Sequence, residues 1–206
     1  MSESRKAGSV ILANLAMFND AVMLFENEIQ DEFIDALNKV IEEWVDNPEW
    51  TGDFKKFIKI YPSKWSISSS EEESYTAATF DWSFLQGDQG SNYLVNLCGF
   101  SQNEMGFTFC VKHDEFGGKL KWSKFCKTLP VSISSGLQAL GFSDTGLGVF
   151  SISIRLNPNL LASSWENENY EEVMQPVIAV LENIKQSVPI FDEMFSLAKA
   201  AGLARV

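Results

Sequence analysis

One stretch, from Phe18 to Asp46, constrains the fold of this chain more than any other. Apolar side chains recur there at steps of three and four residues, a spacing that lays them along one side of an α-helix. They are Phe18, Val22, Phe25, Ile29, Phe33, Leu37, Val40 and Trp44. We expect this side to be buried, and we expect the helix to begin either after a cap at Asn19 or Asp20 or as early as Ala13. It should end before Asn47-Pro48, because the residue that precedes a proline is disfavoured in helical geometry.

The opposite side of the same helix is almost purely anionic. Eight acids lie between the apolar positions: Glu26, Glu28, Asp31, Glu32, Asp35, Glu42, Glu43 and Asp46. Lys39 is the only cation in this stretch. At about 1.5 Å per residue the acids are roughly 4 Å apart on average, near the ~3.4 Å spacing of phosphates along one DNA strand. The pattern fits an acidic docking surface or a nucleic-acid mimic, and the alternative to both is a plain solvated helix.

The composition indicates a single globular domain. Of the 206 residues 45% are hydrophobic, and no stretch rich in Pro, Ser or Gly separates two self-sufficient halves. We predict a flexible N-terminus at residues 1–9 and one α+β domain at residues 10–206. The formal net charge is −12 and the pI is near 4.5. A field of this sign repels nucleic acid and anionic lipid, so a charged partner should present a basic protein surface.

Cysteine usage and hydropathy indicate where the protein works. Cys98, Cys110 and Cys126 are odd in number and too far apart for a close metal pair, so we expect reduced, mostly buried thiols. No apolar run approaches the about 20 residues that span a bilayer, and Val10 to Met17 is short for a signal peptide and broken by Asn14. We therefore expect a cytoplasmic protein with no membrane partner, no direct nucleic-acid partner, and no cofactor or metal.

Alternating apolar residues and turn signals predict a sheet between the terminal helices. The clearest strand is Val149 to Leu156, in which Phe150, Ile152 and Ile154 share the inward side. Further strands are predicted at residues 54–61, 75–82, 93–100 and 107–112, a short helix or irregular segment at 119–129, and two helices between 167 and 202, with Pro189 in the first turn of the second. The prediction is an α+β fold: an antiparallel sheet of about five strands covered by a long N-terminal helix and two C-terminal helices.

Residues that could carry catalysis are few. His113 is the only histidine, and we interpret it as a surface residue at the end of a strand. We interpret Cys110, three residues earlier, as a buried structural cysteine. A divergent or degenerate metal-dependent hydrolase is nevertheless one alternative, with a site drawn from Asp81, Asp88, Glu104, Lys112 and His113. Metal-dependent nucleases carry an acid two residues before a lysine on the second strand of the site, and here Cys110 stands in that place before Lys112.

One segment of the chain interleaves lysines with aromatic residues, as proteins that bind single-stranded nucleic acid do. It comprises Lys119, Lys121, Lys124 and Lys127 with Trp122 and Phe125. Four lysines do not cancel the surrounding negative field, so we interpret them as a solvated face or as a match for an acidic surface of this chain or of a partner.

The leading hypothesis is a non-enzymatic acidic interaction protein that binds a basic protein, a nucleic-acid-binding one included, and inhibits or neutralises it as an immunity or anti-defence factor would. The partner-binding residues are predicted to be Glu28, Asp31, Asp35, Glu42 and Asp46. A domain that binds an apolar small molecule is the other alternative, because the chain is rich in aromatic residues. The acidic helix followed by Ile60-Tyr61 and Trp65 also looks like accessory domains found beside bacterial defence nucleases, and no residue role is carried over from that resemblance.

Overall fold

The computed structural model describes residues 3–54, 58–68, 74–86, 92–101, 103–144, 146 and 148–203. By its internal contacts the chain divides into two compact units, residues 1–39 and residues 40–206. Each unit is described by itself below. The prediction of a flexible segment at residues 1–9 and a single domain at 10–206 stays a prediction, although residues 3–13 are helical in this structure.

The first unit is helical. It contains α1 (Glu3–Ala13), α2 (Leu15–Leu24), a π-helical segment η1 (Phe25–Ile29) and the first part of α3 (Gln30–Val45). The predicted long helix is confirmed, with Leu15 as its first residue and Val45 as its last. α1 meets it at a 90° bend. The bend lies at Asn14, whose backbone is not helical and whose side-chain Nδ2 donates to the carbonyl of Val10 at 2.9 Å.

The π turn in η1 explains how one long helix keeps its apolar side chains aligned. Such a turn holds one residue more than an α turn, so the side chains that follow lag by about 100°. The lag returns Phe33 and Leu37 towards the side that carries Val22 and Phe25. Phe33 and Leu37 are buried, whereas Val22 and Phe25 are half-buried and Phe18 is exposed, so the expected burial of the stripe is met only after η1.

The last turn of α3 belongs to the second unit. There Ile41 and Val45 are buried, while the predicted core residues Val40 and Trp44 are only half-buried. From Phe33 onward the buried residues of the helix are four apart, namely Phe33, Leu37, Ile41 and Val45. Ile41 and Val45 are therefore buried in place of the predicted Val40 and Trp44. Trp44 packs against Trp50 with ring centroids 4.7 Å apart and donates its indole N–H to Glu182 at 2.8 Å.

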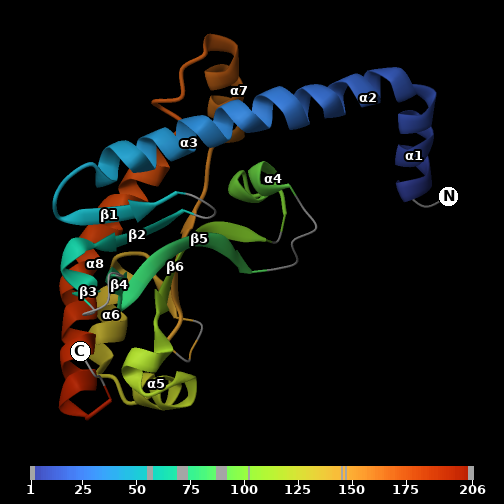
Figure 1. Ribbon diagram of the computed structural model, residues 1–206. Helices are drawn as coiled ribbons and strands as arrows, with labels where there is room; N and C mark the ends of the chain where they lie inside the picture. The colour runs from blue at the N-terminus through green and yellow to red at the C-terminus, as the bar shows by residue number, and fades with distance from the viewer. Residues whose placement is uncertain are drawn as a thin grey trace. The chain divides into compact units, whose positions relative to one another are not determined.

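An antiparallel sheet forms the centre of the second unit (Figure 1). Within the described residues it has six strands in the order β1 (Trp50–Asp53), β2 (Lys59–Pro62), β5 (Ala78–Gln86), β6 (Glu104–Val111), β8 (Phe150–Ile154) and β7 (Ser143–Asp144). A separate hairpin pairs β3 (Ser66–Ser68) with β4 (Ser74–Thr76). The predicted α+β fold, an antiparallel sheet with a long N-terminal helix, is confirmed.

One face of this sheet is aromatic and packs against α8 (Gln175–Ala200). Phe191 of α8 is fully buried and stacks on Phe109 of β6 at a centroid distance of 4.0 Å. Its ring also meets Phe80, Phe142 and Phe150 within 5.6–5.8 Å. Burying a phenylalanine side chain is worth about 1.5–3 kcal/mol, so this cluster is a main source of stability for the unit.

The predicted break before Pro189 is wrong, because α8 runs unbroken through that residue. Pro189 lacks the N–H that would bond to the carbonyl of Lys185. Both residues are exposed, so that carbonyl faces solvent rather than the core. The apolar contacts on the opposite side of α8, such as Phe191, hold the helix together across the missing bond.

Within the described residues of this unit, four shorter α-helices connect the strands or precede α8: α4 (Tyr93–Leu97), α5 (Lys119–Cys126), α6 (Val131–Ala139) and α7 (Pro158–Asn167). α5 and the strand β6 were predicted, whereas the predicted strand at 93–100 is wrong. Asn92 caps α4 by accepting from the backbone N–H of Leu94 at 2.9 Å, and Leu94 and Leu97, three residues apart, are buried together.

Candidate functional sites

The five predicted partner-binding carboxylates all lie on the long helix or just beyond its end. Glu28 lies in η1, Asp31, Asp35 and Glu42 lie in α3, and Asp46 follows the last residue of α3. All five are exposed, and within the described part of the chain none of them forms a hydrogen bond or ion pair. At about 100° per residue the three α3 carboxylates point within about 40° of one another. Their role in binding stays a prediction.

The residues of the hydrolase alternative do not converge in the described structure. Glu104 begins β6 and Lys112 follows its last residue, so the two lie about 26 Å apart at ~3.3 Å per residue. Glu104 approaches Arg155 with 4.0 Å between Oε1 and Nη2, and the ammonium of Lys112 lies 3.4 Å from the ring centroid of Tyr75. Asp88 lies outside the described residues. Among the residues described, no three His, Cys, Asp or Glu side chains are grouped as metal ligands would be.

Asp81 occupies the face of the sheet opposite the aromatic cluster. Its Oδ2 lies 3.8 Å from the ammonium of Lys59, which neighbours it across β2 and β5. Its Oδ1 is buried and has no hydrogen-bond partner within the described residues. Nearby on the same face Ser83 and Thr108 share a hydrogen bond of 2.9 Å between their hydroxyls. These four residues form a polar surface of the sheet with one ion pair. They do not place a nucleophile next to a base, as a hydrolytic site would require.

The thiol of Cys110 and the imidazole of His113 are both poorly suited to act as a catalytic pair. Burial, together with the negative charge of Asp81, raises the pKa of the Cys110 thiol to about 11. At pH 7 such a thiol is ionised in about one molecule in ten thousand, and the thiolate is the nucleophilic form. Burial, together with Lys119, lowers the pKa of His113. All three cysteines are free thiols and half-buried rather than fully buried, so the expected burial is only partly met.

The basic and aromatic residues of α5 separate onto two sides. The four lysines interpreted as a solvated face, Lys119, Lys121, Lys124 and Lys127, are exposed. Trp122 and Phe125 are buried, and Trp122 packs against Phe116 at 4.7 Å between ring centroids. Neither aromatic ring is therefore available to stack on a nucleic-acid base.

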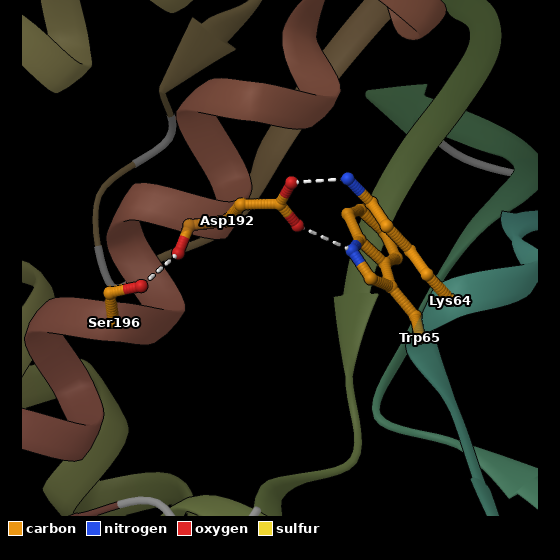
Figure 2. Close-up of polar contacts among 4 residues, drawn as sticks. All are labelled: Lys64, Trp65, Asp192 and Ser196. Carbon is orange, nitrogen blue, oxygen red and sulfur yellow. Dashed lines mark hydrogen bonds and ion pairs between the residues drawn. The ribbon is translucent and has the colours of Figure 1, made fainter.

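Asp192 of α8 joins that helix to the segment η2 (Ser63–Trp65), as Figure 2 shows. One carboxylate oxygen accepts the indole N–H of Trp65 at 2.8 Å, and the other pairs with the ammonium of Lys64. The backbone carbonyl of Asp192 accepts a hydrogen bond from the Ser196 hydroxyl at 2.9 Å. The sequence argument missed this contact, because Trp65 and Asp192 are separated by 127 residues and no local pattern connects them.

A small pocket lies beside this contact. Its volume is about 240 Å³, its apolar lining includes Trp65, Phe116 and Phe195, and Lys64 and Lys199 carry charges at its edge. Pockets for drug-sized ligands usually enclose about 300–1,000 Å³. This pocket is therefore small for an apolar ligand, whereas another pocket, of about 410 Å³ and lined in part by Trp50, Pro62 and Val188, falls within that range. The third hypothesis stays a prediction.

Within the described ranges, no single helix has the length and apolar composition needed to cross a bilayer. The pair formed by α1 and the helix Leu15–Val45 meets those criteria together, but the 90° bend separates its two members.

Comparison with known proteins adds no family to these observations. The chain matches no protein-family model, no curated protein and no solved structure.

Proposed function

We propose that this chain is a non-enzymatic acidic protein of the cytoplasm that binds a basic protein surface and thereby inhibits or neutralises that protein. The contact would be made by Glu28, Asp31, Asp35, Glu42 and Asp46. One observation carries the proposal: all five carboxylates are exposed and form no ion pair within the described residues. Their charge is thus available to a partner at no cost of breaking an internal contact.

The spacing of the carboxylates favours a cationic partner over plain solvation. Asp31 and Asp35 stand four residues apart, where like charges destabilise an isolated helix by about 0.2–0.5 kcal/mol. Lysine or arginine side chains placed between them would turn this repulsion into attraction. A nucleic-acid-binding protein carries such side chains at the spacing of phosphates, so it is the kind of basic partner that we propose.

Electrostatic complementarity of this kind acts mainly on the rate of association. Opposite charges steer two proteins together and raise the association rate constant from about 10⁵–10⁶ towards 10⁸ M⁻¹s⁻¹ or more at low salt. Exposed pairs add only about 0.2–1 kcal/mol each to affinity. The proposal therefore predicts fast, salt-sensitive association.

The first experiment is native mass spectrometry of the protein purified from its own host, which identifies a basic protein that remains bound. Stopped-flow association with that protein is then measured for the triple variant Asp31→Lys, Asp35→Lys, Glu42→Lys. We expect association at least tenfold slower at low salt, with a weaker salt dependence.

A second triple variant, Glu166→Lys, Glu171→Lys, Glu193→Lys, is the matched control. Both triple variants raise the net charge by six, from −12 to −6, but the control acids are exposed residues outside α3. The proposal fails if the α3 variant associates like the unmodified protein, or if both variants slow association equally.

A further inference from the structure

The helix α2 exposes an apolar surface that the proposed function does not use. Within the described structure none of its residues is buried, although eight of its ten residues are Leu, Met, Phe, Val or Ala. Leu15 is 57% exposed, Phe18 45% and Met23 53%. A helix that is apolar over about half of its circumference normally packs that side against another element.

The apolar residues of α2 and η1 follow the spacing of a helix-packing seam. Leu15, Phe18, Val22, Phe25 and Ile29 are separated by alternating steps of three and four residues. From Leu15 to Phe25 this is the a and d pattern of a coiled coil, in which each side chain inserts between side chains of a facing helix, and Ile29 ends the π turn that follows. We call these five residues the α2 seam.

The positions that flank the α2 seam carry charge of one sign. With Leu15 at position a, Glu26 falls at e, one of the positions that select the partner of a coiled coil, and Glu28 lies further along, inside the π turn of η1. No Lys or Arg occurs between Lys6 and Lys39. In a pair formed by two copies of this segment the glutamates would find no cation in either orientation. A facing helix with Lys or Arg at its own e and g positions would pair with them.

We infer that the α2 seam binds an amphipathic helix of a basic protein, one that carries lysine or arginine beside its apolar stripe. This inference rests on the proposed function, which supplies a basic partner, and adds the secondary structure and the apolar surface by which that partner is recognised. The α3 carboxylates would then steer the encounter, and the α2 seam would retain the helix once it is bound.

Two synthetic helical peptides of about four heptads test the inference. Both carry leucine at a and d; one carries lysine at e and g and the other carries glutamate there. Binding of each labelled peptide to the full chain is measured by fluorescence anisotropy. We expect the lysine peptide to bind at least tenfold more tightly than the glutamate peptide, and we expect its binding to weaken with salt.

Two variants of the full chain test whether binding depends on the α2 seam in particular or on any exposed apolar side chain of α2. Phe18→Ala with Val22→Ala removes two seam residues and should weaken binding of the lysine peptide at least tenfold. Met17→Ala with Met23→Ala removes two exposed apolar side chains of α2 that lie off the seam, and should change binding less than threefold. Circular dichroism verifies that both variants keep the helix content of the unmodified protein.

The possible outcomes distinguish this inference from the proposed function. Equal binding of the two peptides, equal loss in the two variants, or a homodimer in native mass spectrometry that the seam variant abolishes would each overturn the inference. If the host partner depends on Asp31, Asp35 and Glu42 but not on Phe18 and Val22, the inference fails and the proposed function stands. If seam-dependent peptide binding persists while the α3 triple variant leaves host-partner association unchanged, the proposed function fails.

Discussion

Replacing Asp192 separates two contributions that its carboxylate makes to the contact between η2 and α8. The side chain of Trp65 is 5% exposed, so its indole N–H depends on Asp192 for a hydrogen bond. The ion pair with Lys64 is more open, because the side chains of Lys64 and Asp192 are 57% and 37% exposed. The indole bond should therefore contribute more to stability than the ion pair.

Asp192→Ala removes both contributions. A buried donor left without an acceptor costs about 1–3 kcal/mol, and an exposed ion pair is worth about 0.2–1 kcal/mol. We expect the free energy of unfolding to fall by about 2–3 kcal/mol. For a folded unit of this size that corresponds to a decrease in Tm of roughly 5–10 °C.

Asp192→Asn keeps an acceptor for the indole, since the amide oxygen can take the place of one carboxylate oxygen, and it removes only the charge. We expect a loss of at most about 1 kcal/mol, similar to that of Lys64→Ala, and smaller still at ~1 M salt, where exposed charges are screened. Glu193→Ala removes an adjacent exposed acid of α8 and should change stability by less than about 0.5 kcal/mol.

Urea unfolding followed by tryptophan fluorescence measures all four variants, and thermal unfolding followed by circular dichroism gives the Tm values. The reasoning would be refuted if Asp192→Asn lost as much stability as Asp192→Ala, or if Lys64→Ala lost more than Asp192→Ala. Either result would mean that the charge, and not the indole hydrogen bond, stabilises this contact.

Three further predictions concern the sheet and its core. A Cβ at Gly106 would lie 2.0 Å from the carbonyl oxygen of Ile152, so Gly106→Ala should lower the free energy of unfolding by about 3 kcal/mol or more. Gly8→Ala is the control, because a Cβ there would meet nothing within 4 Å, and it should not lower the free energy of unfolding. Urea unfolding compares the two variants. Phe191→Ala should cost about 3–5 kcal/mol because the ring is fully buried, and Phe100→Ala, where the ring is 71% exposed, should stay within about 0.5 kcal/mol; a larger loss at Phe100 would contradict the burial argument. Burial raises the pKa of Cys110 to about 11 and that of Cys126, beside Asp144, to about 12. The rate at which iodoacetamide alkylates these two thiols, measured by peptide mass spectrometry, should therefore keep rising above pH 9. A rate that reaches a plateau by pH 9 would show that the thiols have ordinary pKa values.

Elements whose signal is local were predicted from the sequence. The helix from Leu15 to Val45 follows from apolar residues at steps of three and four, and β8 follows from the alternation of Phe150, Ile152 and Ile154. The exposure of the five carboxylates was predicted for the same reason, since helical periodicity alone puts them opposite the apolar stripe. In each case neighbours within one or two turns, or along one strand, carry the information.

Local pattern failed where packing between distant residues outweighs it. The segment at 93–100 has strand-like composition but folds as α4, because Asn92 caps a helix whose Leu94 and Leu97 reach the core together. Pro189 was expected in the first turn of a second helix, but the buried residues on the other side of α8 keep a single helix continuous through it. The predicted hydrolase residues Glu104 and Lys112 lie at opposite ends of β6, which only the strand's length and register determine.

The sequence by itself thus determined which segments have an apolar side and that the long N-terminal helix is anionic. Only the tertiary structure decided the strand order, the Trp65–Asp192 contact and the absence of any gathered metal-ligand set among the described residues. The physical reason is the range of the interactions. Periodicity reflects hydrogen bonds and burial within a few residues, whereas the partners that meet across the core are selected by shape and by burial free energy summed over the whole fold.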